Sequence, residues 1–466
     1  MLNDNRLFPA DPTTRAVART LFEAVRHLPL VSPHGHTEPR WYAENEKFAD
    51  PAQLLIVPDH YATRMLGSQG IKPSALGVPR RDGKAVETDG RTIWRLFAQH
   101  YYLFRGTPTR LWLDTTLQDL FGIEEPLNEG SADRIYDKIA ECLTTDEFRP
   151  RALFNRFNLE VIATTDAATD ELKWHQQIKD SGWDGRVVPT YRPDTVVDPD
   201  KVNFQADLQR FGELSGEDVR TWKGYLEAHR NRRAFFKSMG ATASDHGHPS
   251  ALTADLEYSD AKALYERVRK GKADADEREQ FRAQMLTEMA KMSVDDGLVM
   301  QIHPGAWRNH SPAMFDGYGT DKGFDIPKAT DYVAALKPLL DKVGLEKNLT
   351  IILFTLDETS YARELAPLAG AYPALRLGPP WWFFDSPEGM MRFRELATET
   401  AGFYNTVGFN DDTRAFPSIP ARHDVARRID CAYLARLVVE HRLDENEALA
   451  VVTDLAYRLP KEAYRL

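Results

Sequence analysis

The chain has 466 residues, 42% hydrophobic and 28% charged, a composition that supports a large buried core. Its formal net charge is -11, so a nucleic-acid partner, which requires a basic face, is not expected. The two cysteines, Cys142 and Cys431, are far apart and form no CxxC, which excludes a disulfide framework and a cysteine zinc site. With no signal-peptide pattern and no apolar stretch of roughly 20 residues, we expect a cytoplasmic protein without a membrane partner.

Eight short apolar runs, each followed by a longer segment, are typical of parallel strands buried on both faces of a sheet. Eight such units predict an α/β fold, a closed (β/α)8 TIM-like barrel, rather than an open sheet. The predicted strands cover residues 29–33, 158–164, 186–191, 239–244, 298–303, 350–356, 374–377 and 405–410.

The spacing between the predicted strands is uneven. About 125 residues separate the first strand from the second, far more than one crossover helix requires. Because residues 94–123 within this gap are aromatic and have helical periodicity, we expect an inserted helical subdomain over approximately residues 40–150 of a single 1–466 domain. Residues 200–236 also have a helical pattern, and the charged stretch 274–291 predicts a solvated helix.

The first predicted strand ends in His34-Gly35-His36. Alternate residues of a strand point to the same side, so both imidazoles can face one metal ion. They would lie at the carboxyl end of a barrel strand, where such barrels carry out their chemistry. The pair alone is a weak signal, because an ordinary polar loop explains it as well.

Further metal ligands are available at two other predicted strand ends. His303 ends the fifth predicted strand, and Asp411 and Asp412 follow the eighth. Taken singly, His303 can be a hydrogen-bonded core histidine, and an aspartate can cap a helix. Three histidines and one aspartate from the first, fifth and eighth strands together form a ligand set suited to one divalent ion such as zinc.

A cationic group accompanies this set. Arg192, Arg308 and Arg414 each lie just beyond a predicted strand end, where together they can form a fork site for a carboxylate. Singly, each can be a surface residue with a packed stem. His60 and Tyr61 are a further acid/base pair, although Tyr61 can simply pack with its hydroxyl satisfied.

At these residues the sequence resembles the uronate isomerase (glucuronate isomerase) family, a branch of the amidohydrolase superfamily. The similarity runs through SPHGH, DHYATRM, FNLEVIATTDAATDELKWH, PTYRPD, GATASDHG, MQIHPGAWRN, PPWWFFDSPEGM and NDDTRAF. The resemblance implies an aldose–ketose isomerase that interconverts D-glucuronate with D-fructuronate and D-galacturonate with D-tagaturonate. The expected partner is therefore a small hexuronic acid, with one divalent metal, zinc, as cofactor. A homo-oligomer is left open.

The resemblance also implies a role for each residue. The implied metal ligands are His34, His36, His303 and Asp412, and the remaining functional set is His60, Tyr61, Arg192, Arg308 and Arg414. Asp412 is the expected base or proton shuttle of an enediol route, and Tyr61 its catalytic partner beside His60. The arginines would hold the substrate's carboxylate.

Two departures from the superfamily pattern bear on the metal. Ser32 stands where the superfamily has an aspartate, which affects how the imidazoles are held. After the fourth strand come Asp245 and His246 and no lysine, and the sixth strand ends in LDET without a histidine. We therefore do not expect a two-metal hydrolase site, and Asp245-His246 can support the site from behind.

Two other functions share part of the pattern. A mononuclear metal-dependent hydrolase or decarboxylase of the same superfamily would use the HxH pair and the terminal aspartate but needs no arginine set. A non-catalytic sugar-acid binding protein would use the arginines but gives no reason for the metal ligands.

Overall fold

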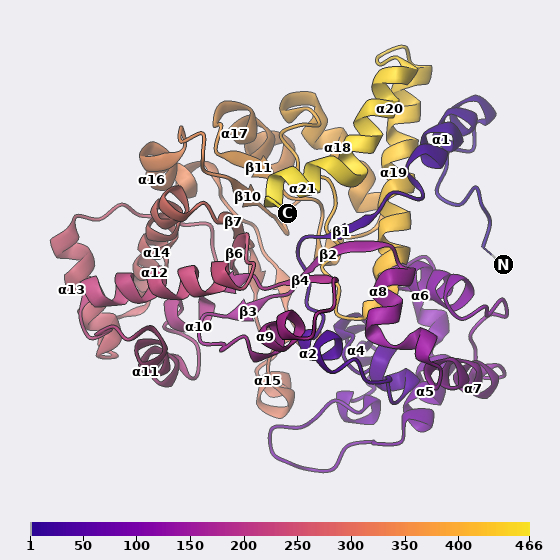
Figure 1. Cartoon of the computed structure of the whole chain (residues 1–466), viewed down its shortest axis with the longest axis horizontal. Helices are drawn as coiled ribbons and strands as arrows, with labels where there is room; N and C mark the ends of the chain where they lie inside the picture. Colours follow the sequence, from indigo (N-terminus) through magenta and orange to yellow (C-terminus); the bar gives the residue numbers. More distant parts are fainter. Residues whose placement is uncertain (1) are drawn as a thin grey trace.

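The computed structural model describes residues 2–466 and shows a ring of short strands with helices around it (Figure 1). One sheet has the order β1-β2-β4, and a second has the order β11-β10-β7-β6-β5-β3. These strands are β1 (Leu30–Ser32), β2 (Leu159–Ala163), β3 (Asp166–Ala167), β4 (Arg186–Val188), β5 (Tyr191–Arg192), β6 (Ala243–His246), β7 (Val299–Ile302), β10 (Ile351–Leu353) and β11 (Leu375–Leu377). Every neighbouring pair is parallel, as the buried apolar runs predict.

The two sheets are parts of one ladder. The Thr164 amide donates to the Val188 carbonyl at 2.9 Å, and the Asp166 amide donates to the Thr190 carbonyl at 3.1 Å. These bonds run across the breaks between β2 and β3 and between β4 and β5, so each pair is one interrupted strand.

The ring closes through the eighth predicted segment. The Val407 amide donates to the Leu377 carbonyl at 3.1 Å, and the His36 amide donates to the Thr413 carbonyl at 2.9 Å. The segment therefore joins β11 on one side and the chain after β1 on the other. The predicted α/β fold with a parallel sheet is confirmed, and these closing bonds are those that a (β/α)8 barrel requires.

Two of the predicted strands differ from the observed ones at a glycine. The fourth begins at Ala243 rather than at residue 239, because Gly240, with φ of 99°, turns the chain out of the preceding helix. The eighth, predicted over residues 405–410, is a single bridge at Thr406. Gly408, with φ of 76°, interrupts the extended backbone there.

The stretch between β1 and β2 is helical. It contains α2 (Pro39–Glu44), α3 (Pro51–Leu55), α4 (His60–Gly67), α5 (Gly90–Gln99), α6 (Pro108–Asp119), α7 (Ala132–Leu143) and α8 (Pro150–Arg156). Many of its aromatic residues lie in one hydrophobic cluster, in which Trp94, Phe97 and Phe104 are at most 1% exposed. That these helices form a separable subdomain stays a prediction.

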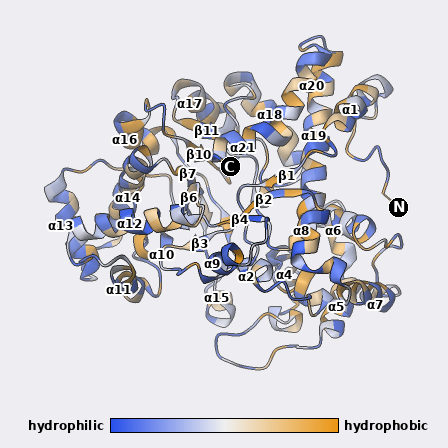
Figure 2. Ribbon diagram, viewed as in Figure 1, coloured by the Kyte–Doolittle hydropathy of each residue, from blue (hydrophilic) through white to orange (hydrophobic). Residues whose placement is uncertain are grey.

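The remaining helices lie around the ring (Figure 1). They are α1 (Pro12–Val25), α9 (Lys173–Asp180), α10 (Asp194–Val197), α11 (Phe204–Ser215), α12 (Trp222–Ser238), α13 (Tyr258–Arg269), α14 (Ala275–Asp296), α15 (Pro312–Tyr318), α16 (Val333–Val343), α17 (Ala366–Ala371), α18 (Pro387–Ala401), α19 (Ile419–Val439), α20 (Glu445–Thr453) and α21 (Leu459–Tyr464). Hydrophobic and hydrophilic residues alternate along many of them, as expected for helices with one face on a core (Figure 2). A short antiparallel pair, β8 (Ala306–Trp307) with β9 (Ile326–Pro327), follows β7.

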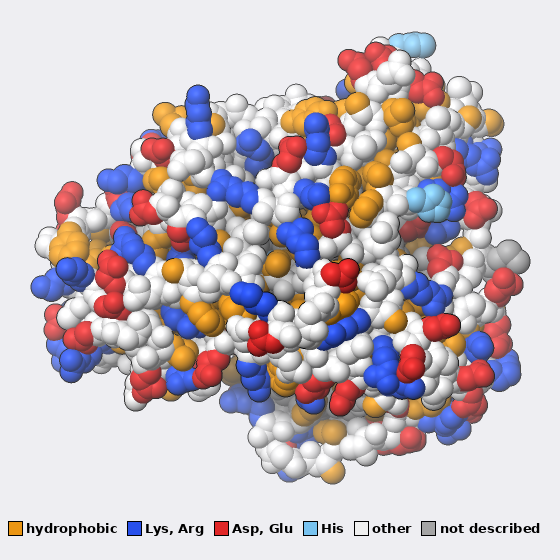
Figure 3. All heavy atoms as spheres, in the orientation of Figure 1, with side chains coloured by type: hydrophobic (Ala, Val, Ile, Leu, Met, Phe, Trp, Pro, Cys, Tyr) orange, Lys and Arg blue, Asp and Glu red, His pale blue; other side chains and the backbone are white. Residues whose placement is uncertain are grey.

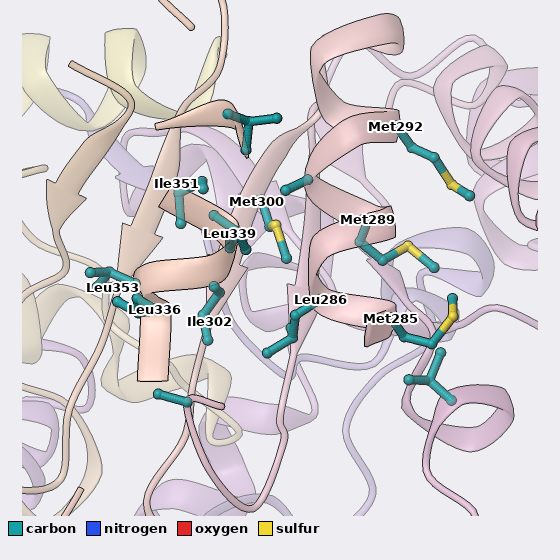
Figure 4. Packing of buried hydrophobic residues seen from close by; sticks show 14 of the residues in the cluster. Met285, Leu286, Met289, Met292, Met300, Ile302, Leu336, Leu339, Ile351 and Leu353 are labelled. Atoms are coloured by element: carbon teal, nitrogen blue, oxygen red, sulfur yellow. The ribbon is translucent and has the colours of Figure 1, made fainter. Parts of the chain in front are cut away.

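The prediction of a solvated helix over residues 274–291 is wrong. In α14, Leu286 points toward Ile302 of β7, while Met285 and Met289 point to the opposite side of the helix (Figure 4). All four side chains are fully buried, so the helix is covered on two sides.

The surface of the protein mixes charges of both signs. Acidic and basic side chains are interspersed over the face shown in Figure 3, without a basic patch. Both cysteines are free. Within residues 2–466, no helix has the length and apolar character needed to cross a membrane.

Candidate active site at the barrel mouth

The four predicted metal ligands lie together at the carboxyl ends of the strands. Asp412 Oδ1 lies 3.0 Å from His36 Nε2 and 3.5 Å from His34 Nε2. The rings of His34 and His303 stack with their centroids 4.8 Å apart. The donor atoms of His34, His36 and Asp412 all lie within 4.8 Å of one another, a spacing that one metal ion can bridge.

The states of His36 and His303 fit a divalent cation. For His34, burial opposes the charge, but Asp412 and Asp245 raise its pKa above the ordinary value. Burial lowers the pKa of His36 to about 4, so its imidazole is neutral, the form that binds a metal. His303 Nε2 is buried and has no hydrogen-bond partner among the described residues. Since buried polar atoms are almost always satisfied, this nitrogen points to a ligand of the site.

Asp245 orients the imidazole ring of His303 through its Nδ1 atom. His303 Nδ1 lies 2.6 Å from Asp245 Oδ1, and Asp245 Oδ2 lies 3.2 Å from the Arg192 guanidinium. Although burial opposes its charge, Arg192 and His303 hold the pKa of this carboxyl well below its ordinary value. Asp245 could also join His34 and His303 in a second ligand set. Because Arg192 already neutralises it, Asp245 is better placed to orient His303 than to bind a cation. His246 is buried in β6 with Nε2 near the Ser244 hydroxyl.

Arg192 is the most constrained of the three arginines. Its Nε donates to Asp194 at 2.8 Å, and Asp245 faces it from the other side. Asp194 also accepts from the Gly247 amide, and a Cβ at Gly247 would lie 2.2 Å from an Arg192 nitrogen. Two buried carboxylates therefore neutralise Arg192 before any substrate arrives.

Arg308 and Arg414 have weaker partners. Arg308 donates to the buried Asp325 at 3.0 Å, and its guanidinium lies over the Trp382 ring at 4.9 Å from the centroid. Arg414 has its nearest acid, Asp321, at 4.0 Å, and its side chain is 35% exposed. Arg414 is thus the freest of the three to meet a ligand.

One cavity of about 500 Å³ unites these groups. It is lined by all three arginines and by the four candidate metal ligands, together with His60. Burial lowers the pKa of His60 to about 3, so this imidazole is neutral. Tyr61 stacks on His60 with centroids 4.4 Å apart, but its hydroxyl donates to the Trp382 carbonyl at 3.2 Å. Tyr61 lines a smaller neighbouring cavity, which it shares with Asp412 and Arg414.

Sequence reasoning missed the residues that aim Asp412. On α19, Arg422 donates to the Asp411 carbonyl at 3.0 Å, and His423 Nε2 lies 3.1 Å from Asp411 Oδ2. Asp411 therefore faces α19, while Asp412, with φ of 44°, faces the histidines. Trp381, whose ring lies 4.6 Å from that of His303, was also missed. The tryptophan pair after the seventh predicted strand was a signal that could have identified it.

A parallel barrel that gathers histidines, an aspartate and arginines in one cavity at its strand ends defines a barrel enzyme with a candidate metal centre. A family model described as glucuronate isomerase matches residues 12–464. The chain belongs to this family, as its motifs predict.

Similar proteins agree over the full length. The chain is 68% identical over 466 residues to the uronate isomerase of Rhizobium meliloti (strain 1021), covering 100% of this chain and 99% of the relative. The crystal structure of glucuronate isomerase from Caulobacter crescentus is 58% identical with a TM-score of 0.98, covering 100% of this chain and 97% of that one. The uronate isomerase from Thermotoga maritima is 27% identical with a TM-score of 0.92, and the coverage is 100% and 99%.

Proposed function

We propose that this uronate isomerase interconverts D-glucuronate with D-fructuronate, and D-galacturonate with D-tagaturonate, by proton transfer through an enediol. The observation that carries the proposal is the meeting of a carboxylate–histidine cluster and three arginines in one cavity. The arginines suit the carboxylate of a hexuronic acid, and the cluster suits the oxygens on carbons 1 and 2. A hydrolase acting on neutral substrates would leave the arginines without a purpose.

We further propose one zinc ion, held by His34, His36 and Asp412, with His303 Nε2 as a further donor. Imidazole nitrogens with a carboxylate oxygen are a donor set that zinc prefers. When bound, the ion would polarise a substrate oxygen. Asp245 supports this arrangement because it occupies His303 Nδ1 and leaves the other ring nitrogen free.

Asp412 is the proposed base that moves the proton between carbons 2 and 1. Its Oδ1 faces the two imidazoles, which leaves Oδ2 for the proton. Tyr61 is its proposed partner, although its hydroxyl must first leave the Trp382 carbonyl. The neutral His60 lines the main cavity and stacks on Tyr61, so it can assist at the substrate's oxygens.

The proposal is tested by incubating the protein with D-glucuronate in deuterated water and measuring ketose formation and deuterium in the product. We expect a ketose that carries solvent deuterium. Binding without turnover would favour a sugar-acid binding protein, and ketose free of deuterium would favour a hydride shift. The cytoplasmic location, membership of the amidohydrolase superfamily and a homo-oligomeric state stay predictions.

A further inference from the structure

The segment of residues 306–327 covers one side of the cavity. It begins and ends in the antiparallel pair of β8 and β9 and contains α15. Its base is fixed, because the Asn309 amide donates to Asp325 at 2.6 Å and the His310 amide donates to the Phe324 carbonyl at 2.9 Å. Between these anchors, residues 319–323 turn toward the arginines, and Asp321 lines the cavity.

Asp321 lies between the two arginines that are freest to bind substrate. Its Oδ1 lies 3.4 Å from Arg308 and 4.0 Å from Arg414. Although the surrounding protein partly desolvates this carboxyl, Arg414, Arg308 and Arg192 lower its pKa to about 2. A carboxylate of the protein itself thus lies where the fields of all three arginines meet.

We infer that Asp321 takes the place of the substrate's carboxylate in the ligand-free protein, and that a hexuronate must displace it from Arg308 and Arg414. The inference rests on the proposed function, since it assumes that these arginines hold the substrate. It gives Asp321 a part in specificity that is separate from catalysis.

The contacts of Asp321 suit a group that is displaced. Its hydrogen bond to Arg308 is long, and its side chain is 44% exposed. Asp325, the other acid on Arg308, is 2% exposed and also accepts a backbone amide at 2.6 Å. Arg308 therefore keeps one permanent partner and offers its remaining donors to either Asp321 or a ligand.

The backbone around Asp321 allows the exchange. Asp321 itself has φ of 59°, a left-handed conformation that aspartate tolerates, and Gly319 and Gly323 have φ of 84° and 85°. Gly323 packs closely, since a Cβ there would lie 2.8 Å from the His60 carbonyl oxygen. The turn thus has a fixed end against α4 and a free centre at Asp321.

The exchange would favour acids over neutral sugars. A hexuronate replaces one carboxylate by another, so the arginines stay paired. A neutral hexose that enters the same place separates Asp321 from the arginines and has no carboxylate to pair with them. Asp321 therefore makes the binding of a neutral hexose less favourable than the binding of a hexuronate.

The inference is tested with Asp321→Asn, which removes the charge and keeps a side chain that tolerates the left-handed conformation. The probes are D-gluconate, a six-carbon sugar acid with no carbonyl group to isomerise, and D-glucuronate as substrate. An exposed ion pair of this kind is worth a factor of about 1.4 to 5 in affinity. We therefore expect the Kd of gluconate and the KM of glucuronate to fall about 1.4–5-fold.

Asp316→Asn is the matched control, because Asp316 is an exposed acid of α15 in the same segment. It makes the same change in net charge and should leave both constants unchanged. In an Arg308→Met background, the effect of Asp321→Asn should shrink, since its nearest partner is gone.

Weaker or unaltered binding by Asp321→Asn would overturn the inference, because Asp321 would then contact the substrate directly or stay apart from it. If the native protein does not turn over glucuronate at all, the proposed function fails instead. If gluconate does not bind to the native protein, the KM of glucuronate decides.

Discussion

Asp245→Asn isolates the part that the buried carboxylate next to His303 plays at the proposed metal centre. Asp245 is 1% exposed and serves both His303, at 2.6 Å, and Arg192, at 3.2 Å. The substitution keeps the size of the side chain and removes the charge that fixes the Nδ1–H form of His303. His303 Nε2 is then no longer held free for the ion.

This geometry predicts a loss of stability and a separate loss of zinc affinity. Breaking a buried ion pair by removing one partner costs about 3–5 kcal/mol. Arg192 keeps Asp194 at 2.8 Å, so we expect a fall in the unfolding free energy of about 3 kcal/mol, at the low end of that range. Removing the partner of a metal-binding histidine should also weaken zinc binding about 10–100-fold.

Asp194→Asn separates the two effects. Asp194 contacts Arg192 and the Gly247 amide but makes no hydrogen bond to His303 within residues 2–466. Both variants should lose stability in urea titrations, while only Asp245→Asn should lose zinc affinity in competition with a chromophoric chelator. Equal zinc affinities in the two variants would refute the orienting role of Asp245.

Three further outcomes are expected. Asp412→Asn should lower turnover of glucuronate at least ~100-fold with the fold intact by circular dichroism, and near-normal turnover would exclude Asp412 as the base. Arg414→Met should lower the ratio of catalytic efficiencies for glucuronate over glucose about 10-fold or more, since a charge-assisted bond is worth roughly 1.5–3 kcal/mol. An unchanged ratio would place the carboxylate elsewhere. Asp166 is 7% exposed, and burial raises its pKa to about 7, above the ordinary 3.8. Its stabilising effect is therefore complete below about pH 4 and is lost as the pH rises through 7, by up to about 4 kcal/mol. Asp166→Asn should lack this loss in urea titrations between pH 4 and 8, and parallel native and variant curves would contradict it.

The barrel could be predicted because its strands are buried on both faces, which leaves a continuous apolar run in the sequence. The burial of α14, which the sequence predicts to be solvated, shows where that reasoning fails. Its first turns are charged, and Met285 and Met289 lie on the side of the helix away from β7, where other parts of the chain bury them. Arg233 of α12, for example, lies 3.8 Å from the Met289 sulfur. Periodicity records which residues are apolar and leaves open how many neighbours a helix has.

The candidate site could be predicted only in part. The spacing of His34 and His36 is a property of the strand, so it can be read from the sequence. The acids that neutralise the arginines are different: Asp194 begins the short helix α10, and Asp321 and Asp325 come from a loop, so their positions depend on the folded chain. The sequence therefore indicates that three arginines lie at the barrel mouth but cannot rank how free each is to bind a ligand.

Asp411 and Asp412 are adjacent, but only Asp412 faces the histidines of the candidate metal site, and contacts from the distant helix α19 determine this orientation. Asp412 adopts a left-handed backbone conformation, with φ of 44°, which costs roughly 1–2 kcal/mol for a residue with a side chain. The bonds that Arg422 and His423 make to Asp411 can offset this cost, since both are buried and involve charged groups. These two residues belong to α19, which supplies none of the proposed metal ligands. The direction in which Asp412 points is therefore fixed by the packing of α19 on the barrel, and loss of either bond should loosen the carboxylate that the proposed mechanism uses as its base.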